Sequence, residues 1–276
     1  MERDKGEKKR KRNRMYSVLL LACIAVFLFS LGKLVGILLD YKDISDFYDA
    51  AAEEFILPQI EVPEIEENKP PVEVDFDKLL SINEDIIGWI YMDDTVVNYP
   101  ILQGDDNFYY LNKSYYKKYL VAGSIYLDTG NDRELGDKHS VIYGHNMKNH
   151  TMFGDMDDFM KAKYLKKHPY VDILLPGGTW LRYEIFSVYR AGVEDGTYDV
   201  PLNKKKELSA FLKVAKEKNM YKDQSDLSLP KVTSRDKVLT LSTCTEDSSD
   251  TERFVVTAVL VEKDGEPVKT NKTKTE

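Results

Sequence analysis

The chain has one cysteine outside its N-terminal apolar segment, and that cysteine lies where a thiol could act as a nucleophile. Cys244 ends the strand-like run 238–244, and nine residues later Arg253 begins a second such run, 253–261. If the two runs pair as an antiparallel hairpin, Cys244 and Arg253 lie opposite each other, with Cβ atoms roughly 5 Å apart. A fixed positive charge favours the thiolate, which is the nucleophilic form of cysteine.

A free cysteine is more often a small buried hydrophobic residue that serves packing alone. Two features favour chemistry at Cys244. The residues before it, Ser242 and Thr243, are polar, and the acidic segment 245–252 after it has the composition of a solvated loop. The thiol is therefore expected at the rim of a sheet.

A nucleophilic thiol needs a proton partner, and His145 is the best placed of the four histidines. It follows an apolar strand and a glycine, which would let the backbone turn at the strand end. We expect His139 to be a surface residue at the start of that strand, and His168, before a proline, to be a solvated helix cap. His145 and His150 lack a third ligand, so neither a metal site nor a cofactor is expected.

The N-terminus predicts a membrane anchor. Residues 1–14 hold eight Lys or Arg and three acidic residues, and the apolar segment 15–39 has no charge before Lys33. This segment is long enough to cross a bilayer once. Basic residues before it keep the N-terminus in the cytoplasm, so the rest of the chain should be extracellular. A cleaved secretory signal is the alternative, and it would also export residues 40–276.

The exported part is strongly acidic. Residues 1–39 carry a net charge of +6 in a chain of net charge −8, so residues 40–276 carry −14. This charge argues against nucleic acid as a partner. Cys23 lies within the apolar segment and cannot pair with Cys244. An unpaired thiol in an exported domain is unusual, which again favours a chemical role.

The pattern along the chain predicts one globular domain at 75–263, preceded at 40–74 by a short amphipathic helix and a Pro- and Glu-rich stalk, and followed by a polar tail at 264–276. Because the stalk should contribute little to the core, a chain beginning at Asp75 is expected to be soluble and folded. The domain is expected to be mainly β, a closed or nearly closed barrel of about eight strands with peripheral helices. The expected strands are 88–92, 96–100, 124–127, 139–143, 170–175, 179–193, 237–243 and 254–262, and the expected helices are 76–87, 107–119, 152–167 and 204–218.

Three motifs carry a family resemblance. Tyr-Gly-His145-Asn-Met, Leu-Ser-Thr-Cys244 and Arg253-Phe-Val-Val, in this order and spacing, resemble the sortases, the cysteine transpeptidases of Gram-positive bacteria. Gly88-Trp-Ile and the extra helix at 204–218 are similar to class B members. The resemblance covers about residues 75–263, and an N-terminal membrane anchor is also typical of the family.

The resemblance implies a sortase-type barrel with an N-terminal helical lead, and a reaction. Cys244 would attack a threonine carbonyl in the C-terminal sorting signal of a surface protein and form a thioacyl-enzyme. An amine of a lipid-linked peptidoglycan precursor would then release the product. His145 would transfer protons, and Arg253 would stabilise the oxyanion. Substrate contacts implied by the resemblance are Asn107, Leu111, Thr197, Tyr198, Ser242 and Thr243.

Other functions remain open at this point. A sortase that polymerises pilins would use a lysine of another protein as the amine. In exported cysteine peptidases and wall hydrolases of the papain type, Cys precedes His in the chain, whereas here His145 precedes Cys244. A tethered binding domain with a degenerate site is disfavoured because all three residues of the motif are present.

Overall fold

The computed structural model describes residues 2–58, 69–224, 227–244 and 252–268. Much of the expected stalk and nearly all of the expected loop at 245–252 lie outside these residues, as do the side chains of residues 2–12 and of Cys244. The chain forms two compact units, Met1–Phe47 and Tyr48–Glu276.

The first unit is a single helix. This helix, α1 (Glu2–Phe55), is longer than the first unit, and its last residues belong to the second unit. Its portion Asn13–Phe55 is long and apolar enough to cross a membrane, and none of its most apolar window is buried in protein. An apolar helix with its side chains exposed is what a bilayer requires of a spanning segment.

Eight strands of the second unit close into a barrel, as expected from the sequence. They are β3 (Ile86–Tyr91), β4 (Asn98–Leu102), β5 (Ile125–Leu127), β6 (His139–Tyr143), β7 (Tyr170–Leu174), β8 (Trp180–Gly192), β9 (Val238–Cys244) and β10 (Glu252–Lys263). The order around the barrel is β10-β8-β7-β3-β4-β5-β6-β9, and β9 pairs again with β10. The pairs β4–β5 and β6–β9 are parallel, and the other pairs are antiparallel.

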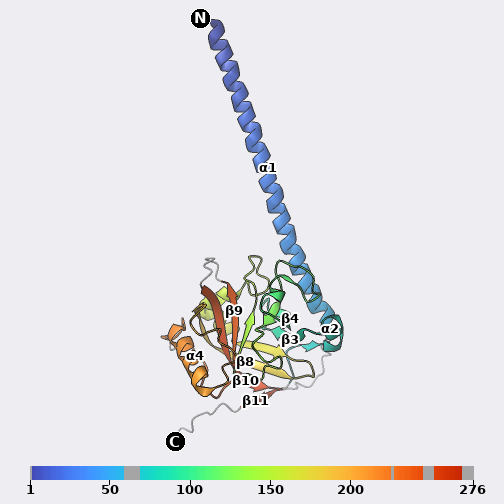
Figure 1. Ribbon diagram of the computed structural model, residues 1–276, viewed down its shortest axis with the longest axis vertical. Helices are drawn as coiled ribbons and strands as arrows, with labels where there is room; N and C mark the ends of the chain where they lie inside the picture. Colours follow the sequence, from blue (N-terminus) through green and yellow to red (C-terminus); the bar gives the residue numbers. More distant parts are fainter. Residues whose placement is uncertain (1, 59–68, 225–226, 245–251, 269–276) are drawn as a thin grey trace. The chain divides into compact units, whose positions relative to one another are not determined.

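Short elements surround the barrel (Figure 1). They are β1 (Ile56–Leu57), β2 (Glu73–Val74), α2 (Phe76–Ile82), η1 (Tyr109–Asn112), η2 (Met156–Met160), α3 (Ala162–Lys167), α4 (Lys205–Lys218) and β11 (Glu266–Pro267). Strand β11 pairs with the end of β10, so part of the expected polar tail folds back onto the barrel.

Three expected helices are shorter or divided in the structure. The helix expected at 76–87 ends at Ile82 because Asn83 is extended, and the Asn83 amide donates to the Tyr110 hydroxyl and the Tyr115 carbonyl. The region 107–119 has only the single turn η1. The region 152–167 divides at Lys161, which is extended between η2 and α3.

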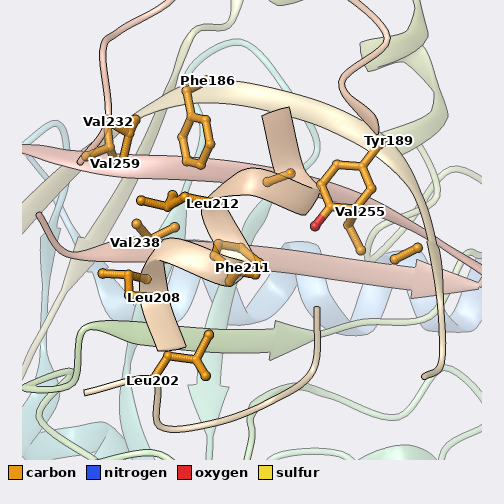
Figure 2. Close-up of a cluster of buried hydrophobic side chains, with 12 residues drawn as sticks. Phe186, Tyr189, Leu202, Leu208, Phe211, Leu212, Val232, Val238, Val255 and Val259 are labelled. Carbon is orange, nitrogen blue, oxygen red and sulfur yellow. The ribbon is translucent and has the colours of Figure 1, made fainter. Parts of the chain in front are cut away.

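Helix α4 forms an outer layer over the barrel. Its apolar residues recur at helical spacing, which gives the helix one buried face. Figure 2 shows that Leu208, Phe211 and Leu212 lie against residues of the strand layer, among them Val238 of β9 and Val255 of β10. The helix therefore stabilises the outer face of the strand that ends at Cys244.

Helix α1 and the stalk contribute more to the core than expected. Tyr48, Ala51 and Phe55 are fully buried, and Val72 is nearly so. The Tyr48 hydroxyl donates to the carbonyl of Gly123, its ring packs edge-on against Tyr99, and β1 pairs with β2. The packed unit thus begins before Asp75, and a chain that starts there lacks part of its own core.

Two histidines that we expected at the surface are buried. His139 has no exposed surface and lies between the Thr240 hydroxyl, 2.9 Å from Nε2, and the Asp199 carbonyl, 3.2 Å from Nδ1. Burial lowers the pKa of His139 to about 4. His168 is also buried, with Nδ1 2.9 Å from a backbone carbonyl. Both expectations were wrong because the covering segments are distant in sequence.

We predict that a chain beginning at Asp40 folds stably, whereas one beginning at Asp75 is strongly destabilised. The shorter chain loses Tyr48, Ala51 and Phe55, whose burial is worth roughly 5 kcal/mol in total. That is a large fraction of the stability of a typical domain, about 5–15 kcal/mol. Urea unfolding of both chains measures the difference. Equal midpoints would contradict a role for the end of α1 in the core.

Candidate active site

His145 follows β6 at one end of the barrel, and Gly144 explains its position. A Cβ at Gly144 would lie 2.5 Å from the Ile125 side chain and 2.7 Å from the Phe153 ring. The Gly144 N–H donates to the Ser242 carbonyl of β9 at 3.1 Å. The glycine is therefore required because the backbone passes close to its neighbours. Gly144 does not have a positive φ. A glycine is therefore not needed here for the sharp backbone turn that we expected.

The imidazole of His145 is held by a backbone carbonyl. Nε2 lies 2.7 Å from the carbonyl oxygen of Leu111, and the ring is half-buried. A carbonyl can only accept, so Nε2 carries the proton and Nδ1 is the basic nitrogen of the neutral ring. Among the described residues, Nδ1 has no hydrogen-bond partner and is free to take a proton.

The carbonyl of Leu111 is itself fixed by its turn. The Asp106 carboxylate accepts from the N–H groups of Phe108 and Tyr109, at 2.8 and 2.7 Å, at the start of η1. Gly123 has φ +56° and passes beneath the turn, and a Cβ there would lie 2.3 Å from the Leu111 oxygen. Only glycine fits this crossing, which places the acceptor for His145.

The expected hairpin between the cysteine and arginine runs is confirmed. Strands β9 and β10 pair antiparallel with Cys244 opposite Arg253. The parallel pairing of β6 with β9 matches Tyr143 to Ser242. His145 and Cys244 each lie two residues beyond this matched pair, at the same edge of the barrel. Arg253 donates to the Glu252 carbonyl at 3.1 Å, so most of its five N–H donors remain available.

A cavity of about 250 Å³ lies at this edge. Among the residues predicted from sequence, those that line it are Asn107, Leu111, His145, Ser242, Thr243 and Arg253. The structure thus brings six predicted residues to one cavity. Larger hollows of about 520 Å³ lie elsewhere on the barrel, but they contain neither a histidine nor a cysteine.

Thr243 is the one buried side chain in the described part of the chain whose polar atom has no hydrogen-bond partner. Thr243 is next to Cys244 in sequence and lines the cavity, and its hydroxyl oxygen is buried. An unsatisfied buried hydroxyl costs about 1–3 kcal/mol. Thr243 stays a candidate substrate contact because it lines the cavity.

Tyr198 and Thr197 lie behind the cavity. The Tyr198 hydroxyl is 3.1 Å from the Ser242 hydroxyl, and its ring stacks on Tyr143 with centroids 6.2 Å apart. Thr197 is fully buried, and its hydroxyl is 3.1 Å from that of Tyr189. Tyr198 can therefore position Ser242, whereas Thr197 stabilises the loop and does not face the cavity.

Sequence reasoning missed a buried carboxylate beneath the cavity. Asp128 accepts from the Asn107 amide at 2.8 Å, from the Tyr143 hydroxyl at 2.8 Å and from the Gly130 N–H at 2.8 Å. Burial, and then the charge of Asp128, raise the pKa of Tyr143. This network holds Asn107 and Tyr143, which both line the cavity, in place. An aspartate directly after an apolar strand was the only signal in the sequence.

The structure gives no support to a metal site at His145 and His150. His150 is exposed and its Nδ1 lies 2.6 Å from the Asp155 carboxylate, whereas His145 contacts a carbonyl. Within the described residues, no three His, Cys, Asp or Glu side chains are grouped as metal ligands would be.

Comparisons with known proteins agree with this geometry. The sortase domain model matches residues 90–261. The chain is 36% identical to sortase B of Listeria monocytogenes over 186 residues, which cover 67% of this chain and 73% of the relative. It is 32% identical to sortase B of Staphylococcus aureus over 187 residues, 67% of this chain and 74% of that one.

Solved structures show the same similarity. The Staphylococcus aureus sortase B–substrate complex aligns with a TM-score of 0.66 at 29% identity, over 80% of this chain and 97% of that chain. Clostridium perfringens sortase B aligns with a TM-score of 0.60 at 32% identity, over 68% of this chain and 100% of that chain. From its sequence, its barrel and these relatives, the chain belongs to the sortase family, as a class B cysteine transpeptidase.

Proposed function

We propose that this transpeptidase is anchored in the cell membrane, cleaves a C-terminal sorting signal after a threonine, and transfers the protein to an amine of a lipid-linked peptidoglycan precursor. The observation that carries the proposal is the strand register. It pairs Cys244 with Arg253 at the edge where His145 follows β6, beside one cavity.

The reaction has two acyl transfers. The Cys244 thiol gives its proton to Nδ1 of His145, and the thiolate attacks the threonine carbonyl. A C–S bond forms, and the C–N bond to the next residue breaks. His145 gives the leaving amine its proton. The precursor amine then attacks the thioester and gives a proton to His145, and the thiolate leaves. Arg253 donates to the oxyanion in both steps, and one such donor is worth about 3 kcal/mol.

The hydrogen bond from His145 to Leu111 defines which nitrogen acts. Nε2 keeps its proton on the Leu111 carbonyl, so Nδ1 accepts and donates the catalytic proton. The ring can thus cycle between its two states without changing orientation.

The substrate peptide would occupy the cavity of about 250 Å³. Thr243 lines this cavity beside Cys244, and Leu111 supplies an apolar wall. The Asn107 amide already bonds to Asp128 and Thr129, so this residue mainly shapes the cavity. The relative from Staphylococcus aureus has been solved as a sortase B–substrate complex, which supports a peptide in this groove.

The apolar portion of α1 supports a single-pass anchor with the barrel outside the cell. Basic residues at the N-terminus favour the cytoplasm. Anchoring would hold the barrel near lipid-linked amines and raise their effective concentration. The partners are then surface proteins with a sorting signal and the peptidoglycan precursor.

We predict that Cys244→Ala abolishes cleavage of a sorting peptide, and that His145→Ala and Arg253→Ala each lower kcat/KM by at least about 100-fold. Peptide cleavage followed by chromatography measures all three variants. His150→Ala is the matched control because this histidine is exposed. His139 and His168 are unsuitable controls because both are buried. A His150 variant as inactive as His145→Ala would refute the assignment of the proton donor.

We predict that Tyr198→Phe raises KM about three- to tenfold, because it keeps the ring on Tyr143 and loses one hydrogen bond to Ser242. Thr197→Val should lower the Tm and leave KM unchanged. Steady-state kinetics and thermal unfolding of both variants separate the two roles. If Thr197→Val raised KM at unchanged Tm, Thr197 would have to contact substrate.

We predict that protease added to intact protoplasts digests the barrel and spares the N-terminal tail. Immunoblotting with tags at both termini measures which part survives. The control is the same treatment after detergent lysis, in which both parts become accessible. A barrel that resists protease in intact protoplasts would contradict the extracellular location.

A further inference from the structure

We propose that the barrel has a second binding site, for a phosphate-type oxyanion, at the end opposite the active-site cavity. A hollow of about 340 Å³ lies there, lined by the cationic residues Lys138, Arg235, Lys237 and Lys263. Its apolar lining includes Leu135, Leu181 and Leu260, all buried.

Strand pairing brings the cations together. Parallel strands β6 and β9 match His139 to Val238, so Lys138 and Lys237 are neighbours, each one residue before its strand. Lys263 ends β10, which runs antiparallel to β9, and the Leu260 N–H donates to the Lys237 carbonyl at 2.9 Å. The strands β6, β9 and β10 thus lead to the catalytic residues at one end and bear lysines at the other. Seven residues of β9 separate the ends, roughly 20 Å.

These cations form no ion pair with the described residues. The ammonium groups of Lys138 and Lys237 donate to backbone carbonyls. Among the described residues, no carboxylate oxygen lies within 4.0 Å of a side-chain nitrogen of the four cations. Two carboxylates, Glu134 and Asp236, also line the hollow. That of Asp236 is engaged, since it accepts from the N–H and the hydroxyl of Thr233 in its own turn.

The crowding of like charges has an electrostatic cost. Burial lowers the pKa of Lys237, and the charges of Lys138 and Lys263 lower it further, against a smaller opposite effect of Asp132 and Asp137. The mutual repulsion of these lysines is therefore costly without a ligand. Such costs are typical of binding sites, where stability is given up for function.

The lining defines the class of ligand. Four cations around one hollow favour a compact group with more than one negative charge, and lysine binds phosphate oxygens as a point charge. The apolar lining lowers the local dielectric and strengthens the attraction. Free phosphates and phosphate groups along a polymer share this chemistry.

The test uses the full chain in detergent micelles and tripolyphosphate as the probe, with binding measured by calorimetry at fixed ionic strength. We expect Lys237→Gln/Lys263→Gln to weaken binding at least tenfold. The matched control is Lys205→Gln/Lys206→Gln, which removes two exposed lysines of α4 and should bind as the unaltered chain does. Equal binding by both double variants, or no binding by the unaltered chain, would overturn the proposal.

A second readout does not depend on the probe. Without ligand, Lys237→Gln should raise the Tm because it removes like-charge repulsion, and tripolyphosphate should then raise the Tm less than in the unaltered chain. A lower Tm without ligand would overturn the electrostatic argument. Cleavage of a sorting peptide should be unchanged in this variant, so failure of the anion site and failure of the proposed transpeptidation are distinguishable.

Further titrations identify the source of the phosphate. If orthophosphate and long-chain polyphosphate bind with the same affinity per site, the ligand is a free anion. If the affinity rises with chain length, the ligand is a polymer. Polyglutamate serves as a carboxylate polymer of similar charge. If polyglutamate bound as tightly as polyphosphate, specificity for phosphate would be refuted.

Discussion

The parallel pairing of β6 with β9 is the constraint on which the rest of the structure depends. It completes the closed barrel, together with the pairing of β9 with β10, and matches Tyr143 to Ser242. His145 and Cys244 follow that matched pair on adjacent strands. A slip of one residue would turn every side chain of β9 to the opposite face and separate the proposed nucleophile from its proton partner.

The pairing needs support from both sides of the strands, and close packing supplies it. Gly144 lets β6 approach Phe153, and Gly123 lets the chain cross beneath the carbonyl that holds His145. Helix α4 covers the outer face of β9, where the buried His139 bonds to Thr240. These contacts fix side chains in advance of substrate, which is how a site avoids the entropic cost of ordering itself during the reaction.

Local patterns were enough to predict the eight strands and the pairing of Cys244 with Arg253, because period-two alternation and a hairpin are properties of neighbouring residues. They failed where distant segments meet. His139 begins a strand like many surface residues, and only α4 and the Asp199 loop make it buried. Tyr48 is likewise covered by residues some 75 positions away. The basic hollow also depends on the order of the strands in the barrel, so no short sequence motif predicts it.

The most direct test of the account is the intact mass of the chain after mixing with a peptide that contains the sorting threonine. Without an amine, the account predicts a mass increase equal to the peptide's acyl part, mapped to Cys244 by fragmentation. Adding an amine should remove the adduct and yield a peptide–amine product of matching mass. An adduct on another residue, or product formed with no adduct on Cys244 at any time in the reaction, would contradict the claim that these strands assemble a cysteine transpeptidase.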